Sequence, residues 1–334
     1  MNAKSILIAG GAGYIGSHTA KLLARRNYQP VVLDNLITGH QGAARFGPFY
    51  QGGIEQSELV ARIAREHDIS SAVLFAAHAY VGESVQNPGK YYRNNVAQSI
   101  ALLDTLLAAG VRQVVFSSSC SVYGLQTQMP ITEDSSLDPL SPYAESKMFM
   151  ERMLHWYGKA YGLRSVSLRY FNAAGADPEG ELGECHDPET HLIPLAILST
   201  LGKGELQVFG DDYPTPDGTC IRDYVHVSDL GEAHILAVEH LQNGGASDTI
   251  NLGTGTGNSV LEVIRTVQDI SGRPVLYRTV PRRQGDAPVL VADRQKALRV
   301  LGWKPQSSEL KTIVETAWQW HFRRGALPPV RSSR

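Results

Sequence analysis

Apolar runs and helical patterns alternate through the first half of the chain. Short apolar runs typical of buried strands occur at 5–9, 31–33, 72–75, 114–116 and 166–168. Segments with apolar positions at helical spacing lie between them, at 14–26, 59–67, 91–109 and 142–157. Strands that alternate with helices of this length favour a parallel sheet covered on both faces. We therefore predict an α/β fold with a doubly wound parallel sheet of the Rossmann type.

The pattern changes after residue 172. Segments 173–189 and 210–218 are rich in glycine, proline and acidic residues, which indicates loops. Residues 250–252 look like one more strand of the main sheet, so the two lobes are expected to exchange segments. We predict a dinucleotide-binding domain over 1–173 and about 222–254. A smaller mixed α/β substrate-binding lobe is expected over about 174–221 and 255–330.

Three glycines follow the first predicted strand and open the first helix. Gly10 permits the tight turn, Gly13 lets the backbone approach a pyrophosphate, and Gly16 lets the helix pack on the strand. Asp34 lies at the end of the second strand, eighteen residues after Gly16, where a carboxylate accepts hydrogen bonds from the adenosine ribose. Because a carboxylate there repels a 2′-phosphate, the pattern predicts NAD rather than NADP.

A tyrosine and a lysine four residues apart follow on the helix at 142–157. Tyr143 and Lys147 share one helix face, so we expect the ammonium to lower the phenol pKa from its usual value near ~10. A phenolate is a base for a sugar or alcohol hydroxyl. Ser119 ends the preceding strand, at the carboxyl edge of the sheet, and can hydrogen-bond a substrate oxygen. Together with the glycine-rich turn, these residues predict hydride chemistry.

Composition limits the remaining possibilities. The chain has 334 residues, 43% of them hydrophobic, and a formal net charge of −2, so no nucleic-acid partner is expected. No apolar run approaches the ~20 residues that span a bilayer, and the N-terminus lacks the features of a signal peptide, so no membrane partner is expected. Three cysteines without a Cys-x-x-Cys pair indicate neither a disulfide framework nor zinc. We expect a cytoplasmic protein without a metal centre.

Several longer motifs make the sequence recognisable. They are Gly-Gly-Ala-Gly-Tyr-Ile-Gly-Ser-His (10–18), Ser-Pro-Tyr-Ala-Glu-Ser-Lys (141–147), Arg-Tyr-Phe-Asn (169–172), Asp-Gly-Thr-Cys-Ile-Arg-Asp-Tyr-Val-His-Val (217–227), Asn-Leu-Gly-Thr-Gly (251–255) and Pro-Arg-Arg-Gln-Gly-Asp (281–286). With these motifs the chain resembles the extended short-chain dehydrogenase/reductases that act on nucleotide sugars. It is most similar to the UDP-glucose (UDP-galactose) 4-epimerases, over nearly its whole length.

The resemblance implies a set of site residues. The catalytic group would consist of Tyr143, Lys147 and Ser119. NAD would contact Gly10, Gly13, Tyr14, Ile15, Gly16, Asp34, Asn35, Phe75, Ala76, Ala77, Asn94, Ser117, Tyr143, Lys147 and Tyr170. The UDP-sugar would contact Ser119, Tyr143, Asn172, His191, Leu192, Phe209, Arg222, Arg283, Asp286 and Leu290.

The resemblance also implies a mechanism and an assembly. Tyr143 would take the proton of the 4-hydroxyl while hydride leaves C4 for tightly held NAD. The 4-keto sugar would turn over in the pocket and receive the hydride on its opposite face. Members of the family are usually homodimers that pack two long helices per subunit, and the helix at 91–109 is a candidate for this role.

Alternatives remain open at the level of the substrate and of the protein class. Leu290 and His191 occupy positions that bear on sugar size, which leaves a UDP-N-acetylhexosamine or a UDP-pentose as alternatives to the UDP-hexose. Dehydration is disfavoured because Cys120 and Ser121 stand where dehydratases of this family carry an acidic pair. A dehydrogenase that releases NADH, and a non-catalytic NAD-binding sensor, are the alternatives of another kind.

Overall fold

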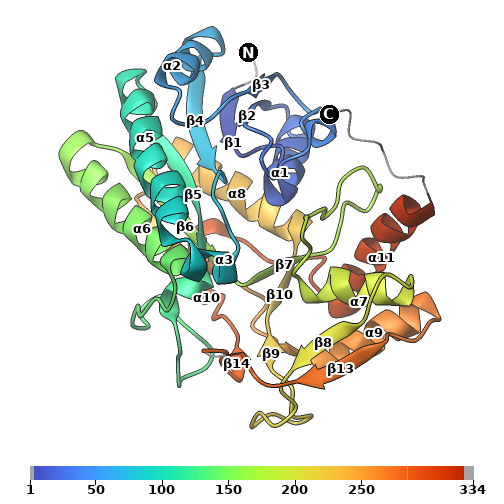
Figure 1. Cartoon of the computed structure of the whole chain (residues 1–334). Helices are drawn as coiled ribbons and strands as arrows, with labels where there is room; N and C mark the ends of the chain where they lie inside the picture. The colour runs from blue at the N-terminus through green and yellow to red at the C-terminus, as the bar shows by residue number, and fades with distance from the viewer. Residues whose placement is uncertain (1–3, 284, 327–334) are drawn as a thin grey trace.

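The computed structural model of the chain describes residues 4–283 and 285–326. Within these residues, seven parallel strands form the central sheet, in the order β11-β6-β5-β4-β1-β2-β3 (Figure 1). The strands are β1 (Ser5–Ala9), β2 (Gln29–Asp34), β3 (Phe49–Gln51), β4 (Ile69–Leu74), β5 (Gln113–Ser119), β6 (Arg164–Tyr170) and β11 (Asp248–Leu252). The predicted doubly wound parallel sheet is confirmed, and residues 250–252 belong to it as expected.

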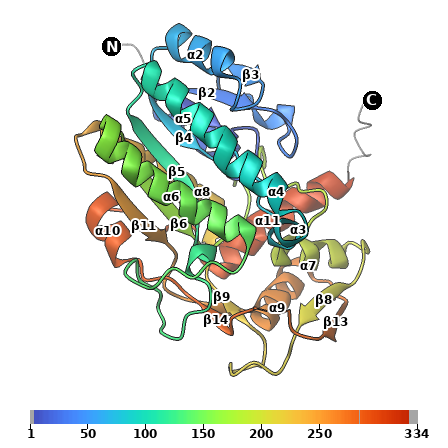
Figure 2. The same ribbon diagram turned by 60° about the vertical axis from the view of Figure 1, so that its left-hand side comes forward.

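Alternate residues of the strands face opposite helical layers. In β1, Leu7 and Ala9 pack with α2 (Ser57–Glu66), α5 (Gln98–Ala108) and α6 (Pro142–Tyr161), which lie over the same face in Figure 2. Ile6 and Ile8 pack with α1 (Tyr14–Arg25), α8 (Val227–Gln242) and α10 (Gln295–Leu301) on the other face. Both faces of the central strands are therefore buried, and this explains why the sequences of these strands are continuous apolar runs.

The helix expected at 91–109 is less regular than its pattern suggests. It begins with α4 (Pro88–Tyr91), passes through a π-helical segment at Tyr92–Ala97, and continues as α5. In the π segment the Asn95 side chain accepts a hydrogen bond from the His78 amide (2.9 Å) and donates one to the His78 carbonyl (3.0 Å). Insertions of this kind are frequent at functional sites. This one bonds Asn95, the neighbour of the predicted cofactor contact Asn94, to the segment that follows β4.

The remaining elements form a second packed group, at the lower right of Figure 1. A third apolar core joins α7 (Leu192–Thr200), α9 (Val260–Ser271), α11 (Leu310–Ala326) and β8 (Leu206–Phe209), and β8 pairs in parallel with β13 (Tyr277–Val280). Shorter pairs connect this group to the sheet: β7 (Asn172–Ala174) with β10 (Tyr224–His226), and β9 (Ile221–Arg222) with β12 (Asn258–Ser259) and β14 (Val289–Leu290). The predicted division into two lobes stays a prediction. Within the segment assigned to the substrate lobe, α10 packs on the sheet, and residues 327–330 lie outside the described residues.

A buried carboxylate connects these groups. Asp223, between β9 and β10, is fully buried and accepts hydrogen bonds from the Thr254 amide (2.8 Å), the Thr254 hydroxyl (2.7 Å) and the Ala292 amide (3.2 Å). Burial raises the pKa of Asp223, and its hydrogen-bond donors offset part of that cost. The carboxylate thereby fixes the neighbouring Arg222 relative to the end of β11. Among the described helices, none is long and apolar enough to cross a membrane.

Candidate active site

The glycine-rich turn passes very close to a neighbouring strand end. Gly10 has a φ of +81°, and a Cβ on it would lie 2.5 Å from the Ala76 nitrogen. A Cβ on Gly16 would lie 2.3 Å from the Gly10 carbonyl oxygen. Gly13 caps the start of α1 and is less crowded, since the nearest atom to its Cβ would be 3.4 Å away. Packing therefore requires glycine at 10 and 16, while position 13 leaves a cradle at the helix N-terminus that suits a pyrophosphate.

Asp34 is fixed at the end of β2, beside this turn. Its two carboxylate oxygens accept hydrogen bonds from the Ala12 amide (3.0 Å) and the Leu36 amide (2.8 Å). These bonds set the orientation of the carboxylate and leave lone pairs for a diol such as the adenosine ribose. Asn35 follows, and its side chain accepts a hydrogen bond from the Ile37 amide. The turn and the carboxylate together fit NAD.

Other predicted cofactor residues reach this region mainly through their backbone. The Phe75 and Ala76 amides both donate to the Ala9 carbonyl, which brings 75–77 against the glycine-rich turn. The Tyr14 hydroxyl donates to the Gly175 carbonyl (2.6 Å), and Ile15 packs against the sheet core. We therefore expect Tyr14 and Ile15 to meet the dinucleotide with their amides at the start of α1.

The three predicted catalytic residues lie together where β5 ends. Ser119 is the last residue of β5, and Tyr143 and Lys147 project from the first turns of α6. The Ser119 hydroxyl hydrogen-bonds the Tyr143 phenol. Lys147 is buried, and its Nζ donates to the Ser117 carbonyl (2.7 Å) at 5.8 Å from the centre of the Tyr143 ring. The Ser117 hydroxyl in turn hydrogen-bonds the Tyr170 phenol.

The electrostatics of this group correct one expectation from the sequence. Burial raises the pKa of Tyr143 to about 12, and the hydrogen bond from Ser119 offsets only part of the rise. Burial also lowers the pKa of Lys147 to about 7, against an opposing effect of Glu151. The prediction that the Lys147 ammonium lowers the Tyr143 pKa is therefore wrong for the chain by itself. The physical reason is that the ammonium is directed at a carbonyl and is too deeply buried to stay fully charged.

A buried ion pair behind the catalytic group escaped the sequence analysis. Arg169 forms two hydrogen bonds with Glu151, at 2.9 and 2.5 Å, and both side chains are less than a tenth exposed. The Ser118 hydroxyl donates to the same carboxylate, and Arg169 also donates to the Tyr123 hydroxyl (2.8 Å). These bonds tie β5, β6 and α6 together. No spacing along the sequence signals this pair, because Glu151 and Arg169 come from different elements.

Two arginines predicted to hold UDP lie in the second packed group. Arg222 donates to the Ala287 carbonyl (2.8 Å) and lies 3.4 Å from Asp286, so its guanidinium is oriented and mostly buried. The Arg283 guanidinium lies 3.7 Å from the centre of the Phe209 ring, a cation–π contact. The Asp286 amide donates to the Arg283 carbonyl, which connects the two contacts along the chain, and two guanidinium groups are suited to a nucleoside diphosphate.

The other predicted substrate residues lie in β7, in β14 and at the start of α7. Asn172 is held in β7, where its side chain donates to the Asp223 carbonyl (3.0 Å). Leu290 pairs with Arg222 in the strand register and packs near Cys120, which follows Ser119. Leu192 begins α7 and packs on the third core. His191 precedes it, and its Nδ1 faces Glu184 (2.7 Å) and Glu189 (3.0 Å), so its predicted sugar contact stays a prediction.

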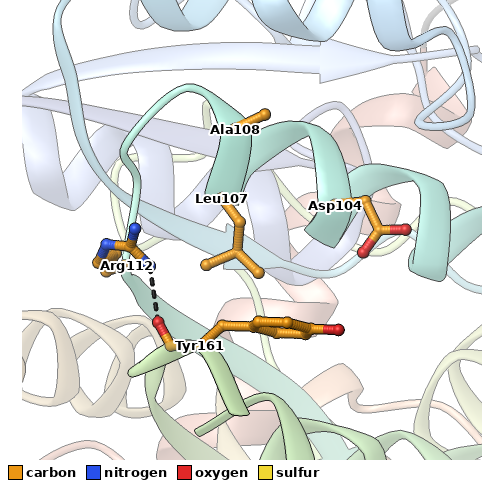
Figure 3. A pocket seen from close by; sticks show the side chains of 5 residues that line it. All are labelled: Asp104, Leu107, Ala108, Arg112 and Tyr161. Atoms are coloured by element: carbon orange, nitrogen blue, oxygen red, sulfur yellow. Dashed lines mark hydrogen bonds between the residues drawn. The ribbon is translucent and has the colours of Figure 1, made fainter.

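A separate cavity of about 350 Å³ lies at the opposite edge of the sheet (Figure 3). Its lining comes from the end of α5 and from Arg112 and Tyr161, which precede β5 and β6. Arg112 donates to the Tyr161 carbonyl (2.7 Å) across it. Ligand sites of open α/β sheets form outside the carboxyl ends of the strands, and this cavity is at the amino ends. It therefore does not belong to the catalytic site.

Comparison with known proteins agrees with this geometry. Residues 6–253 match the model of the NAD dependent epimerase/dehydratase family. A UDP-glucose 4-epimerase from Halalkalibacterium halodurans is 49% identical over 318 residues, which cover 95% of this chain and 95% of the relative. The crystal structure of UDP-glucose 4-epimerase from Brucella ovis in complex with NAD is 51% identical, with a TM-score of 0.94 over 96% of this chain and 98% of that one. A UDP-glucose-4-epimerase from Stenotrophomonas maltophila with bound NAD and formylated UDP-arabinopyranose is 38% identical, with a TM-score of 0.93 over 97% and 99% of the two chains.

These likenesses define first a class: an NAD-dependent enzyme built on the epimerase/dehydratase fold. The chain belongs to the NAD-dependent epimerase/dehydratase family and, within it, to the UDP-glucose 4-epimerases. The resemblance drawn from the sequence motifs, and NAD as the cofactor, are confirmed.

Proposed function

We propose that this protein interconverts UDP-galactose and UDP-glucose by inverting C4 through a 4-keto intermediate. The observation that carries the proposal is the grouping of Ser119, Tyr143 and Lys147 at the carboxyl edge of the sheet, beside the glycine-rich turn. Arg222, beside Asp286, and Arg283, over the Phe209 ring, support a diphosphate anchor.

The residues of the chain have two roles in the reaction: some transfer a proton, and others position the substrate. Ser119 donates a hydrogen bond to the sugar 4-oxygen, and the Tyr143 oxygen takes the 4-hydroxyl proton. The glycine-rich turn, Asp34 and Lys147 would hold NAD⁺, which would supply a reversible hydride acceptor for C4 and a positive charge that favours the Tyr143 phenolate. After the sugar has turned over, Tyr143 gives its proton back to the 4-oxygen, which completes inversion at C4. Arg222 and Arg283 hold the diphosphate throughout, so that binding energy remote from C4 positions both faces of the sugar.

Leu290 supports the choice of a hexose without an N-acetyl group. It pairs with Arg222 and lies between the diphosphate anchor and the end of β5. A branched side chain there takes up part of the space that a bulky substituent would need. UDP-N-acetylhexosamine and UDP-pentose are the alternatives that the experiment below separates.

The test is to purify the protein without added cofactor and to incubate it separately with UDP-galactose, UDP-N-acetylgalactosamine and UDP-arabinose. Chromatography then detects the C4 epimer of each. We expect UDP-galactose to be converted without added NAD. Conversion of only the pentose or the N-acetyl sugar would keep the mechanism and refute the substrate. No conversion of any of them, even with NAD supplied, would favour a dehydrogenase or a non-catalytic sensor.

We also propose that the protein acts as a homodimer through the outer face of α5 and α6. These helices lie side by side in front of the sheet in Figure 2. Their exposed large apolar side chains include Ile100, Phe149 and Trp156. An apolar surface of this kind is favoured as an interface. Sedimentation analysis of wild type and Trp156→Glu tests it, since an unchanged dimer in the variant would contradict the proposed face.

We further propose the cytoplasm as the compartment. The Cys120 thiol lies beside Ser119, and burial raises its pKa to about 12, which keeps it a thiol. A reducing compartment preserves such a side chain next to the catalytic group. Detection of the protein in the cytoplasmic fraction of its host tests this, and recovery with extracellular proteins would contradict it.

A further inference from the structure

Four metal-ligating side chains converge in the loop between β7 and α7. Glu184, His186, Glu189 and His191 each offer one ligand atom, and these four atoms lie within 4.8 Å of one another. None of them belongs to the catalytic group at the end of β5. They come from eight consecutive positions, so the loop must curl back on itself to bring them together.

The ligand atoms lie close enough together to surround one small ion. The His191 Nδ1 lies 2.7 Å from Glu184 Oε1 and 3.0 Å from Glu189 Oε1. The His186 Nδ1 lies 3.1 Å from Glu184 Oε1 and 3.8 Å from Glu189 Oε2. In a tetrahedral zinc site with bonds of about 2.0–2.2 Å, neighbouring ligand atoms lie roughly 3.3–3.6 Å apart. Three of the four separations are shorter than this, because without an ion the rings and carboxylates are directly hydrogen-bonded, and the fourth is slightly longer, so an ion would move the ligand atoms apart by a few tenths of an ångström.

Charge balance also favours a cation here. Glu184 and Glu189 have less than a tenth of their side-chain surface exposed, so two carboxylates are withdrawn from water. In the metal-free chain two imidazolium rings balance them, although both rings approach the same Glu184 oxygen and repel each other with centres 5.2 Å apart. Binding of a divalent cation would displace the two ring protons. A divalent cation with two neutral imidazoles gives the same net charge without that repulsion.

Neighbouring elements hold the loop backbone in this conformation. Trp320 of α11 donates to the Glu184 carbonyl (2.8 Å), and the Tyr80 hydroxyl donates to the Pro188 carbonyl (3.3 Å). The rings of Tyr14 and Tyr80 each present an edge contact to His186. Supporting contacts of this kind orient metal ligands in proteins.

We propose that Glu184, His186, Glu189 and His191 bind a divalent transition-metal ion of the zinc class. Four protein ligands close the coordination sphere, so the role is structural rather than catalytic. The site joins Tyr14, at the start of the cofactor-binding helix, to His191, directly before the predicted UDP contact Leu192. The ion would thus fix the substrate-side loop against the cofactor side of the cleft. The absence of a Cys-x-x-Cys pair predicted no metal centre, but the spacing His186-x-x-Glu189-x-His191 supplies ligands without cysteine.

The test measures metal content and cobalt binding in untagged, full-length protein. After dialysis against metal-free buffer, mass spectrometry of the metals should find about one equivalent of zinc or a similar ion per chain. His186→Ala and Glu189→Gln should retain less than about a tenth of that amount. His155→Ala, which removes an exposed histidine on α6, is the matched control and should keep the full equivalent.

A second measurement keeps the proposal testable if a variant does not fold. Wild type stripped with a chelator is titrated with Co²⁺ alone, and the visible absorption of tetrahedral cobalt should rise to saturation at about one equivalent. Wild type without metal and without a cobalt spectrum would refute the site, as would full metal content in folded His186→Ala. Both readouts are independent of epimerase activity, so failure of the proposed reaction would leave this result unaffected.

Discussion

The catalytic edge of the sheet favours the uncharged forms of its ionisable side chains, whereas the loop at 184–191 favours the charged forms. At the sheet edge, burial raises the pKa of Tyr143 and lowers that of Lys147, so both groups are moved toward their uncharged forms. In the loop, burial alone would lower the pKa of His186, but hydrogen bonds with Glu184 and Glu189 outweigh it and raise the pKa to about 9. The same factors raise the pKa of His191 to about 10.

This difference in pKa shifts indicates what each region can do. Burial favours the uncharged forms of the phenol and the amine. Such groups can exchange protons when a charged cofactor or substrate changes the local electrostatic potential. Carboxylates and imidazoles that face one another are held by mutual attraction, which suits a clamp more than a proton relay. The positions of the two regions agree with this division, since one lies where β5 ends and the other borders the start of α7.

The largest effect is expected from removing the phenolic oxygen at the sheet edge. Tyr143→Phe should lower kcat by about 10²–10⁴-fold, the usual contribution of a positioned general base, and leave UDP affinity nearly unchanged. Steady-state kinetics and UDP titration measure the two quantities. Tyr157→Phe is the matched control, because this tyrosine lies on the same helix and bonds Asp104 away from the site. A Tyr143→Phe enzyme with more than about a tenth of wild-type kcat would refute the assignment.

The buried lysine gives the next largest effect, on stability. Its folded pKa of about 7 lies below the unfolded value near ~10.4, so between these values the unfolded chain binds more protons and stability rises with pH. From pH 7 to pH 9.5 nucleotide-free wild type should therefore gain about 3 kcal/mol in the free energy of unfolding relative to Lys147→Met, in which the other titrating groups are unchanged. Lys147→Met lacks that gain, and urea unfolding at both pH values measures the difference.

The control for the lysine is on the same helix. Lys159 is exposed and stacks over Trp156, so Lys159→Met should follow wild type at both pH values. If Lys147→Met and wild type gained equally between pH 7 and pH 9.5, the lysine would not be held near neutrality, and the contrast between the two regions would fail.

The sequence was sufficient for the sheet and for the proximity of the catalytic residues, but not for their protonation. Continuous apolar runs and Gly10, Gly13 and Gly16 follow from local rules, so the strands and the first turn were predictable. The three-residue strand at Phe49–Gln51 was missed because it is too short to show a period. The direction of the Lys147 ammonium toward Ser117, and the Arg169–Glu151 pair, depend on tertiary packing that no spacing reveals.

On the substrate side, the planar guanidinium of Arg222 rather than its charge alone should determine UDP affinity. Arg222→Lys keeps one positive charge but loses the planar fork that the Ala287 carbonyl and Asp286 orient. We expect UDP to bind about 10–100-fold more weakly, the equivalent of a lost charge-assisted bond worth about 1.5–3 kcal/mol. Calorimetric titration of UDP measures it, with Arg282→Lys as control, since Arg282 pairs with the exposed Asp212. Equal affinities in Arg222→Lys and wild type would remove Arg222 from the diphosphate anchor.

The smallest effect concerns the ring beneath the second arginine. Phe209→Leu keeps an apolar side chain in β8 but removes the π face that lies 3.7 Å from the Arg283 guanidinium. A cation–π contact at an exposed site contributes about 0.5–1 kcal/mol, so UDP affinity should fall about two- to five-fold while kcat is retained. The same calorimetric titration resolves this change, and a double variant with Arg283→Leu isolates the coupling of the pair. Additive losses in the double variant would show that Phe209 and Arg283 act independently. In that case, Arg283 would reach the diphosphate without support from the ring.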